Sequence, residues 1–168
     1  ADAVSRAVAG MDAVVHVAAL AGVGVRADDY ERANVAVTQH VLDACRIHGV
    51  ARLVFTSTPS VVYGVSRGIE GGDETLPYPA RHLAHYPRTK AEAERRVLAA
   101  NGPELMTCAL RPHLMLGPGD PHLVPRLLAK RRAGRLRRVG RDACRVDWTD
   151  VDDAAAAHVA ALDRLTSA

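Results

Sequence analysis

The sequence predicts an α/β protein built around a parallel sheet. Short runs of apolar and β-branched residues alternate with longer segments of helical periodicity. Repeated strand-then-helix order favours parallel strands joined by right-handed crossovers. The composition agrees, because 48% of the 168 residues are hydrophobic and 24% are charged, as in ordinary globular proteins. No apolar run approaches the roughly 18 residues that indicate a membrane span.

The first half of the chain contains two strand–helix units. A short helical segment precedes an apolar strand at 13–19, and a helix follows at about 29–48, where apolar residues recur at about every fourth position. Asp28 is a candidate N-cap of this helix, and Gly49 is a candidate stop. A second apolar strand is expected at 52–57.

The second half begins with a polar loop at 64–81, and a connection of this length usually serves as a lid or substrate loop. Pro87 is tolerable in the first turn of the helix that follows. The remaining expected elements are a helix at about 86–100, a strand at 105–111, a Pro- and Gly-containing loop at 112–121, and helices near 122–133 and 152–165 that flank two short strands.

The most informative motif is Tyr86 followed by Lys90. Residues i and i+4 share one face of a helix. An ammonium about 5 Å from a phenol contributes about 3 kcal/mol at an effective dielectric of about 20, toward the roughly 4 kcal/mol that brings a phenol pKa near neutrality. An oxidised nicotinamide ring would be a second cation, so the pair suits proton transfer beside NAD(P)+. The alternative is an exposed helix whose Tyr packs and whose Lys is solvated.

Three hydroxyl side chains end the strand before this motif: Thr56, Ser57 and Thr58. Ligands of open parallel sheets bind outside the carboxyl ends of the strands. A hydroxyl at this position could polarise a carbinol or carbonyl. Thr and Ser are also ordinary turn formers at strand ends, so each of them has a plain structural interpretation as well.

With these motifs, the chain resembles the extended short-chain dehydrogenase/reductase family of the NAD-dependent epimerase/dehydratase type. Within it, the chain is most similar to the 3β-hydroxysteroid dehydrogenase and sterol-4α-carboxylate 3-dehydrogenase branch. The resemblance implies a Rossmann-like, doubly wound parallel sheet. The segments that carry it, in family order, are 12–19, 32–38, 53–64, 86–90, 110–113, 117–120 and 146–153.

The resemblance implies that Tyr86 is the catalytic acid/base, and that Lys90 lowers its pKa and binds the nicotinamide ribose. The hydroxyl partner falls on Thr58 when counted from the strand, but on Pro59 when counted back from 61–64, so one residue is inserted. Thr58 is the predicted partner, with Ser60 and Ser57 as alternatives.

The resemblance also implies contacts with NAD or NADP. For Asn34, a buried amide that holds backbone or water in place is an equal alternative. The residue that distinguishes the two coenzymes follows a strand that we expect to lie outside this chain. The implied coenzyme contacts are Val17, Ala18, Ala19, Asn34, Thr56, Ser57, Lys90, Pro112 and His113.

By this comparison, residues 1–139 form a partial dinucleotide-binding domain and 140–168 begin a substrate-binding lobe. The chain has no G-x-x-G-x-x-G turn, which normally holds the pyrophosphate at a helix N-terminus. We therefore expect a fragment that is incomplete at both ends and inactive alone. Because its sheet edge would be open, we expect either marginal solubility or pairing with another chain, for example as a homodimer.

Three functions follow from the resemblance. The first is an NAD(P)-dependent oxidoreductase acting on a sterol-like secondary alcohol or ketone, which the motifs at 58–62 and 86–90 favour. The second is a nucleotide-sugar 4-epimerase or dehydratase with the same Tyr/Lys chemistry. The third is a non-catalytic, NAD(P)-binding regulatory relative.

Other classes of function have little support. Cys45, Cys108 and Cys144 have no metal-binding or disulfide-framework spacing, and no metal site is predicted. Basic residues cluster at 126–145, but the net charge is only +3 and no aromatic residues interleave, so a solvated face is favoured over nucleic-acid binding. We expect a cytoplasmic protein with no membrane span.

Overall fold

The main sheet has three parallel strands, β1 (Ala13–His16), β2 (Arg52–Thr56) and β3 (Met106–Leu110), in the order β1–β2–β3. The computed structural model describes residues 1–22, 24–64, 68–120, 123–137 and 145–166. Arg52 pairs with Ala13 on one side and with Met106 on the other. The carboxyl ends of all three strands therefore meet at one edge, and the predicted parallel sheet is confirmed.

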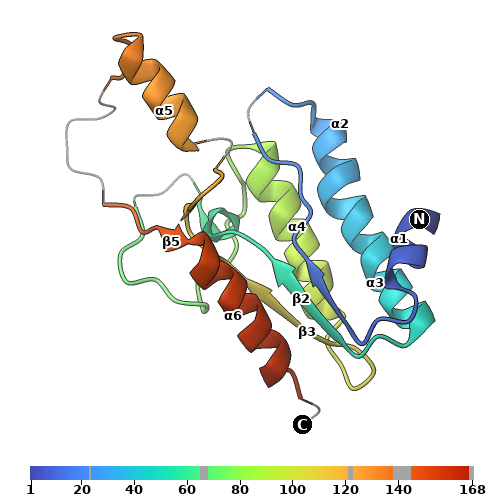
Figure 1. The fold of residues 1–168 in the computed structure, drawn as a ribbon. Coiled ribbons are helices and arrows are strands. Elements are labelled where there is room, and N and C mark those ends of the chain that lie inside the picture. Colours follow the sequence, from blue (N-terminus) through green and yellow to red (C-terminus); the bar gives the residue numbers. More distant parts are fainter. Residues whose placement is uncertain (23, 65–67, 121–122, 138–144, 167–168) are drawn as a thin grey trace.

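Helices cover both faces of this sheet, as predicted for a doubly wound fold. Figure 1 shows α6 on one side of the strands and α3 and α4 on the other. A π-helix, η1 (Glu31–Ala36), joins α2 to α3, and a 3-10 helix, η2 (Pro59–Val62), follows β2. The α-helices are α1 (Asp2–Val8), α2 (Ala27–Tyr30), α3 (Val37–His48), α4 (His85–Ala99), α5 (Leu123–Arg132) and α6 (Val151–Arg164).

The long helix predicted at 29–48 is present as the continuous segment α2–η1–α3. Its N-cap is Arg26, which makes no side-chain capping hydrogen bond, so the prediction of Asp28 as the cap is wrong. Asp28 lies in the first turn instead, where a carboxylate is favourable beside the positive end of the helix. Gly49 ends the segment with a left-handed φ of 66°, which confirms the predicted stop.

Two strand predictions need correction. β1 ends at His16 rather than at residue 19. Further along, the Asn34 side chain takes both backbone hydrogen-bonding groups of Leu20. The two short strands are β4 (Met115–Leu116) and β5 (Thr149–Asp150), which pair in parallel. β4 precedes α5, so it does not lie between α5 and α6. This pair joins residues on both sides of the boundary predicted at 139/140, which stays a prediction.

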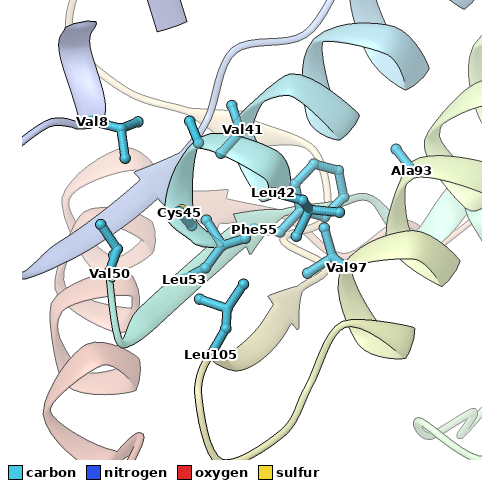
Figure 2. Close-up of a cluster of buried hydrophobic side chains, with 11 residues drawn as sticks. Val8, Val41, Leu42, Cys45, Val50, Leu53, Phe55, Ala93, Val97 and Leu105 are labelled. Atoms are coloured by element: carbon cyan, nitrogen blue, oxygen red, sulfur yellow. The ribbon is translucent and has the colours of Figure 1, made fainter. Parts of the chain in front are cut away.

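The hydrophobic core lies between β2 and the helices α3 and α4 (Figure 2). Leu53 and Phe55 of β2 pack with Leu42 and Cys45 of α3 and with Val97 of α4. The intervening residues of β2 are also buried, as is usual for a central parallel strand. The end of β2, where the predicted hydroxyl residues lie, is therefore held on both faces.

Three further observations concern the described residues. None of their helices is long and apolar enough to cross a bilayer. They contain no group of three or more His, Cys, Asp or Glu positioned for a metal ion. Cys45 is fully buried and Cys108 half-buried, both as free thiols, and burial raises the pKa of each. Cys144 lies outside the described residues.

Candidate active site

Tyr86 and Lys90 lie in the first two turns of α4, beside the carboxyl end of β2. Lys90 is 2% exposed, and its Nζ donates a 2.7 Å hydrogen bond to the Thr56 carbonyl oxygen. The same ammonium lies 4.0 Å from the centre of the Phe55 ring, within the range of a cation–π contact. The predicted proximity of the Tyr/Lys pair to the strand tip is therefore present.

The electrostatics of the pair differ from the expectation. Burial raises the pKa of Tyr86, the nearby Thr58 side chain opposes this, and Tyr30 adds to it. Burial also lowers the pKa of Lys90 to about 8, although Glu94 opposes that shift. The pKa of the Tyr86 phenol is therefore raised rather than lowered, with burial as the largest cause. The Lys90 ammonium is directed at the Thr56 carbonyl oxygen and the Phe55 ring.

Thr58 is the hydroxyl residue that faces Tyr86. Its Oγ1 accepts a 3.3 Å hydrogen bond from the Ser60 backbone N–H and lies 3.1 Å from Ser60 Oγ. Thr58 thereby caps the 3-10 helix η2, whose first residue is Pro59. Pro59, on which the other count places the hydroxyl partner, begins this helix immediately after Thr58.

Ser57 points elsewhere. Its backbone N–H donates to the Leu110 carbonyl oxygen at 2.6 Å, which continues the sheet. Its buried Oγ makes no hydrogen bond of ordinary geometry within the described part of the chain, although it lies close enough to Glu94 to help lower the pKa of that carboxyl. Of the two alternatives to Thr58, Ser60 has a side chain within hydrogen-bond distance of the Thr58 hydroxyl, whereas the Ser57 side chain is directed away from it.

The Thr56 side chain faces α6. His158 Nδ1 donates to the Ala154 carbonyl oxygen at 2.6 Å, so its Nε2 accepts from the Thr56 hydroxyl at 2.7 Å. The predicted coenzyme contact of Thr56 stays a prediction, and its hydroxyl is engaged by His158. Thr56 serves the site through its carbonyl oxygen, which holds Lys90.

The residues that follow β1 are exposed, and they lie at the edge of the sheet where the strands have their carboxyl ends. Val17 is 57% exposed, and Ala18 and Ala19 are exposed as well, as a coenzyme contact requires. Asn34 is 2% exposed and supports this segment, because its Oδ1 accepts from Leu20 N at 2.7 Å and its Nδ2 donates to Leu20 O at 3.1 Å.

Asn34 also reaches α4. Its Nδ2 lies 3.1 Å from the Thr89 hydroxyl oxygen, and that hydroxyl in turn bonds to the backbone around Tyr86. Its described hydrogen bonds therefore go to protein groups, which matches the alternative interpretation of a buried, structural amide.

Pro112 and His113 follow β3, and the His113 ring faces a pocket of about 330 Å³. His113 Nδ1 donates to the Asp147 carbonyl oxygen, so its Nε2 accepts from the Tyr63 hydroxyl at 3.0 Å. Part of the predicted substrate loop lines this pocket. The lining residues are Ile69, Gly71, Gly72, Asp73, Glu74 and Leu76 of the loop, together with Pro59, Val62, Tyr63, Arg111, His113 and Asp147.

A buried ion pair behind Lys90 was not predicted. Glu94 is fully buried, and Arg111 binds both of its carboxylate oxygens while Tyr78 donates to Oε1 at 2.6 Å. Burial would raise the pKa of Glu94, but these donors lower it overall. Burial and Glu94 together raise the pKa of Tyr78 to about 12. The sequence carried one signal, since Glu94 stands four residues after Lys90 on the same helix face.

The geometry can be compared with known proteins. The sequence matches the family described as 3-beta hydroxysteroid dehydrogenase/isomerase over residues 1–168. The 2-alkyl-3-oxoalkanoate reductase of Stenotrophomonas maltophilia strain K279a is 52% identical over 97% of this chain and 50% of that protein. The decarboxylating sterol-4-alpha-carboxylate 3-dehydrogenase of Homo sapiens is 37% identical over 95% of this chain and 43% of that protein.

Solved structures agree on the architecture. UDP-glucuronic acid 4-epimerase from Bacillus cereus in complex with NAD superimposes with a TM-score of 0.79 at 26% identity, over 98% of this chain and 53% of that chain. The chain spans about half the length of the curated relatives it matches.

Proposed function

Because the chain belongs to the 3-beta hydroxysteroid dehydrogenase/isomerase family, we propose that its native-length protein is an NAD(P)-dependent oxidoreductase that interconverts a ketone and a secondary alcohol. The observation that carries the proposal is the Tyr86 phenol, which faces the Thr58 hydroxyl while Lys90 is anchored behind it. This arrangement offers two hydroxyl groups to one substrate oxygen.

The residues fit the nicotinamide end of a dinucleotide. Ala18 and Ala19 are small and exposed at the carboxyl end of β1, so a flat ring can approach the backbone there. An ammonium has three N–H donors, and the described contacts of Lys90 assign one of them, to Thr56 O. The coenzyme, when bound, would supply or accept the hydride. The fit concerns this end alone, because the chain has no Gly-rich turn for the pyrophosphate.

Tyr86 is suited to donate a proton. Its raised pKa keeps the phenol protonated at neutral pH, which is the form required when a ketone is reduced. In that direction the O–H bond of Tyr86 breaks and a new O–H bond forms on the substrate oxygen, while the Thr58 hydroxyl donates a hydrogen bond to the same oxygen. Oxidation of the alcohol would need the phenolate form, which a nearby cation favours.

We propose a 3-oxo or 3-hydroxy acid with a large apolar group as the substrate class. The names of the bacterial and the human relative describe different carbon skeletons, but in both the reacting carbon lies next to the carbon that bears the carboxylate. This shared relationship, at 52% and 37% identity, supports the acid over other alcohols.

A nucleotide-sugar epimerase is the second candidate, and the structural likeness to the Bacillus cereus enzyme favours it. It carries less weight, because that likeness accompanies 26% identity whereas the reductase shares 52%. Tyr86 and Thr58 would handle the proton in both proposals. The two differ in the substrate and in the net reaction, because an epimerase oxidises and then reduces the same carbon and leaves the coenzyme unchanged overall.

The test uses the native-length protein with NADPH and NADH, a 2-alkyl-3-oxo acid and UDP-glucuronic acid. We expect coenzyme oxidation with the 3-oxo acid and no epimerisation of the sugar nucleotide. Tyr86→Phe should remove about 99% of the turnover or more, a proton-transfer contribution of about 10², while coenzyme affinity measured by fluorescence stays within about twofold. Turnover that survives Tyr86→Phe would refute the proposed role, and epimerisation without net reduction would favour the second candidate.

A further inference from the structure

We propose that Tyr30 is a positioning residue that holds the segment after β1 and the Tyr86 ring in a fixed relation to each other. The inference rests on the proposed function of Tyr86. Tyr30 is the last residue of α2 and is 4% exposed. It lies outside the sequence motifs from which the candidate site was predicted.

The hydroxyl of Tyr30 holds the backbone of the segment that follows β1. It donates a 2.5 Å hydrogen bond to the carbonyl oxygen of Gly22. Gly22 has a φ of +125°, and a Cβ added there would meet nothing within 4 Å. Glycine is therefore required by the backbone conformation rather than by crowding, and this conformation supplies the carbonyl that Tyr30 binds.

The ring of Tyr30 packs against the first turn of α4. Its centre lies 6.4 Å from that of Tyr86 at an interplanar angle of 58°, and 6.5 Å from that of His85 at 28°. These separations lie within the range of favourable aromatic pairs. One buried side chain thus contacts the catalytic phenol with its ring and the predicted coenzyme-binding segment with its hydroxyl.

These two contacts of Tyr30 would couple coenzyme binding to the position of the Tyr86 side chain. Val17, Ala18 and Ala19 belong to the segment that Tyr30 fastens at Gly22. A coenzyme that orders this segment favours one position of Tyr30, and the Tyr30 ring limits the positions open to Tyr86. Tyr30 also helps to raise the pKa of Tyr86, after burial and against Thr58, so its hydroxyl affects when the phenol is protonated.

Tyr30→Phe separates the two contacts, because it keeps the ring and removes the bond to Gly22. In the native-length protein we expect coenzyme affinity, measured directly by fluorescence of the reduced coenzyme, to weaken about fivefold, the value of one neutral hydrogen bond. The alkaline limb of the rate of ketone reduction should move to lower pH, because the variant lacks the Tyr30 contribution that helps to raise the pKa of Tyr86. Tyr30→Leu removes the ring as well and should lower kcat about tenfold further.

A purely structural Tyr30 would give a different result. Tyr30→Phe would then lower the melting temperature but leave coenzyme affinity and the pH limb unchanged at a temperature where the protein is folded, and this would overturn the inference. The affinity measurement does not depend on turnover. If Tyr86→Phe stayed active, the proposed function would fail, yet the fluorescence titration would still decide whether Tyr30 holds the coenzyme-binding segment.

Discussion

The ammonium of Lys90 donates a 2.7 Å hydrogen bond to the carbonyl oxygen of Thr56, the last residue of β2. This bond joins α4 to the central strand at the level of the candidate active site. Lys90 is therefore a structural tie in this chain in addition to its proposed contact with the coenzyme. Substitution of Lys90 should therefore lower the stability of the fold through the lost bond to Thr56, and should impair catalysis through the lost coenzyme contact.

Lys90→Met tests the buried charge through the pH dependence of stability. Burial lowers the pKa of Lys90 to about 8 from 10.5, so the unfolded chain binds more protons than the folded chain between these values. The stability of wild type relative to Lys90→Met should then rise from pH 8 to pH 10.5, by about 3 kcal/mol at most. Urea unfolding of both proteins at pH 7, 8, 9 and 10 measures the difference.

The chain contains a matched control for this experiment. Lys130 lies on α5 and is exposed, so Lys130→Met should show no such pH-dependent difference. A flat difference curve for Lys90→Met would mean that Lys90 keeps an ordinary proton affinity in the folded protein.

His16 should make the protein sensitive to acid. Burial, aided by the positive charge of Lys90, lowers the pKa of His16 to about 4 from 6.5. The Thr38 hydroxyl donates to Asn34 O, so His16 Nε2 donates to Thr38 Oγ1 at 3.0 Å. The neutral ring is the stable form in the folded chain. Its stabilisation is complete above pH 6.5 and is lost as pH falls towards 4, up to about 3 kcal/mol.

The measurement compares wild type and His16→Asn in urea at pH 4.5, 5.5, 6.5 and 7.5. The asparagine variant should be less stable at neutral pH but should lose less stability on acidification. Parallel pH curves for the two proteins would show that another group is responsible for the acid sensitivity.

Glu94→Gln should strongly destabilise the folded chain. Arg111 and Tyr78 both donate to the Glu94 carboxylate, which is fully buried, so the variant leaves a largely buried guanidinium without its counter-charge. Loss of one partner from a buried pair costs about 3–5 kcal/mol. Arg111 is partly exposed, so we expect the lower end of this range, measured by urea unfolding at pH 7.

Glu92→Gln is the control on the same helix. Glu92 pairs with Arg96 at 2.9 Å, but their side chains are 37% and 38% exposed, and such pairs contribute less than about 1 kcal/mol. Equal losses for the two variants would show that burial of the Glu94 pair has no energetic consequence.

The sequence predicted the features of this protein that depend on local pattern. Apolar runs located the three strands, and the Tyr86/Lys90 spacing placed both residues on one face of α4 beside the end of β2. Gly49 ended its helix as expected because a left-handed residue there favours glycine. Each of these features is decided within a few residues of the chain.

The features that could not be predicted depend on contacts between distant segments. The Thr56 hydroxyl is hydrogen-bonded to His158, 102 residues away in the chain. The Tyr30 ring, at the end of α2, contacts the Tyr86 ring in α4. The direction of the Lys90 ammonium and the burial that raises the pKa of Tyr86 both depend on how α4 packs against its neighbours. No periodicity in the sequence contains that information.

The identity of the assisting hydroxyl can be settled by a set of small substitutions. Thr58 faces Tyr86, Ser60 is hydrogen-bonded to Thr58, and Ser57 is buried towards Glu94. In the native-length protein, Thr58→Ala should lower kcat for ketone reduction about 10²-fold, because the developing charge on the substrate oxygen loses one donor. Thr58→Ser keeps the hydroxyl and should recover most of the rate.

The serine variants make the test discriminating. Ser60→Ala removes only a neighbour of Thr58 and should cost less than about tenfold, whereas Ser57→Ala should leave kcat nearly unchanged. Thr58→Ala also removes the cap of η2, so its melting temperature and coenzyme affinity are measured as well, to separate a folding defect from a catalytic one. A larger loss of kcat in Ser60→Ala than in Thr58→Ala would transfer the role to Ser60.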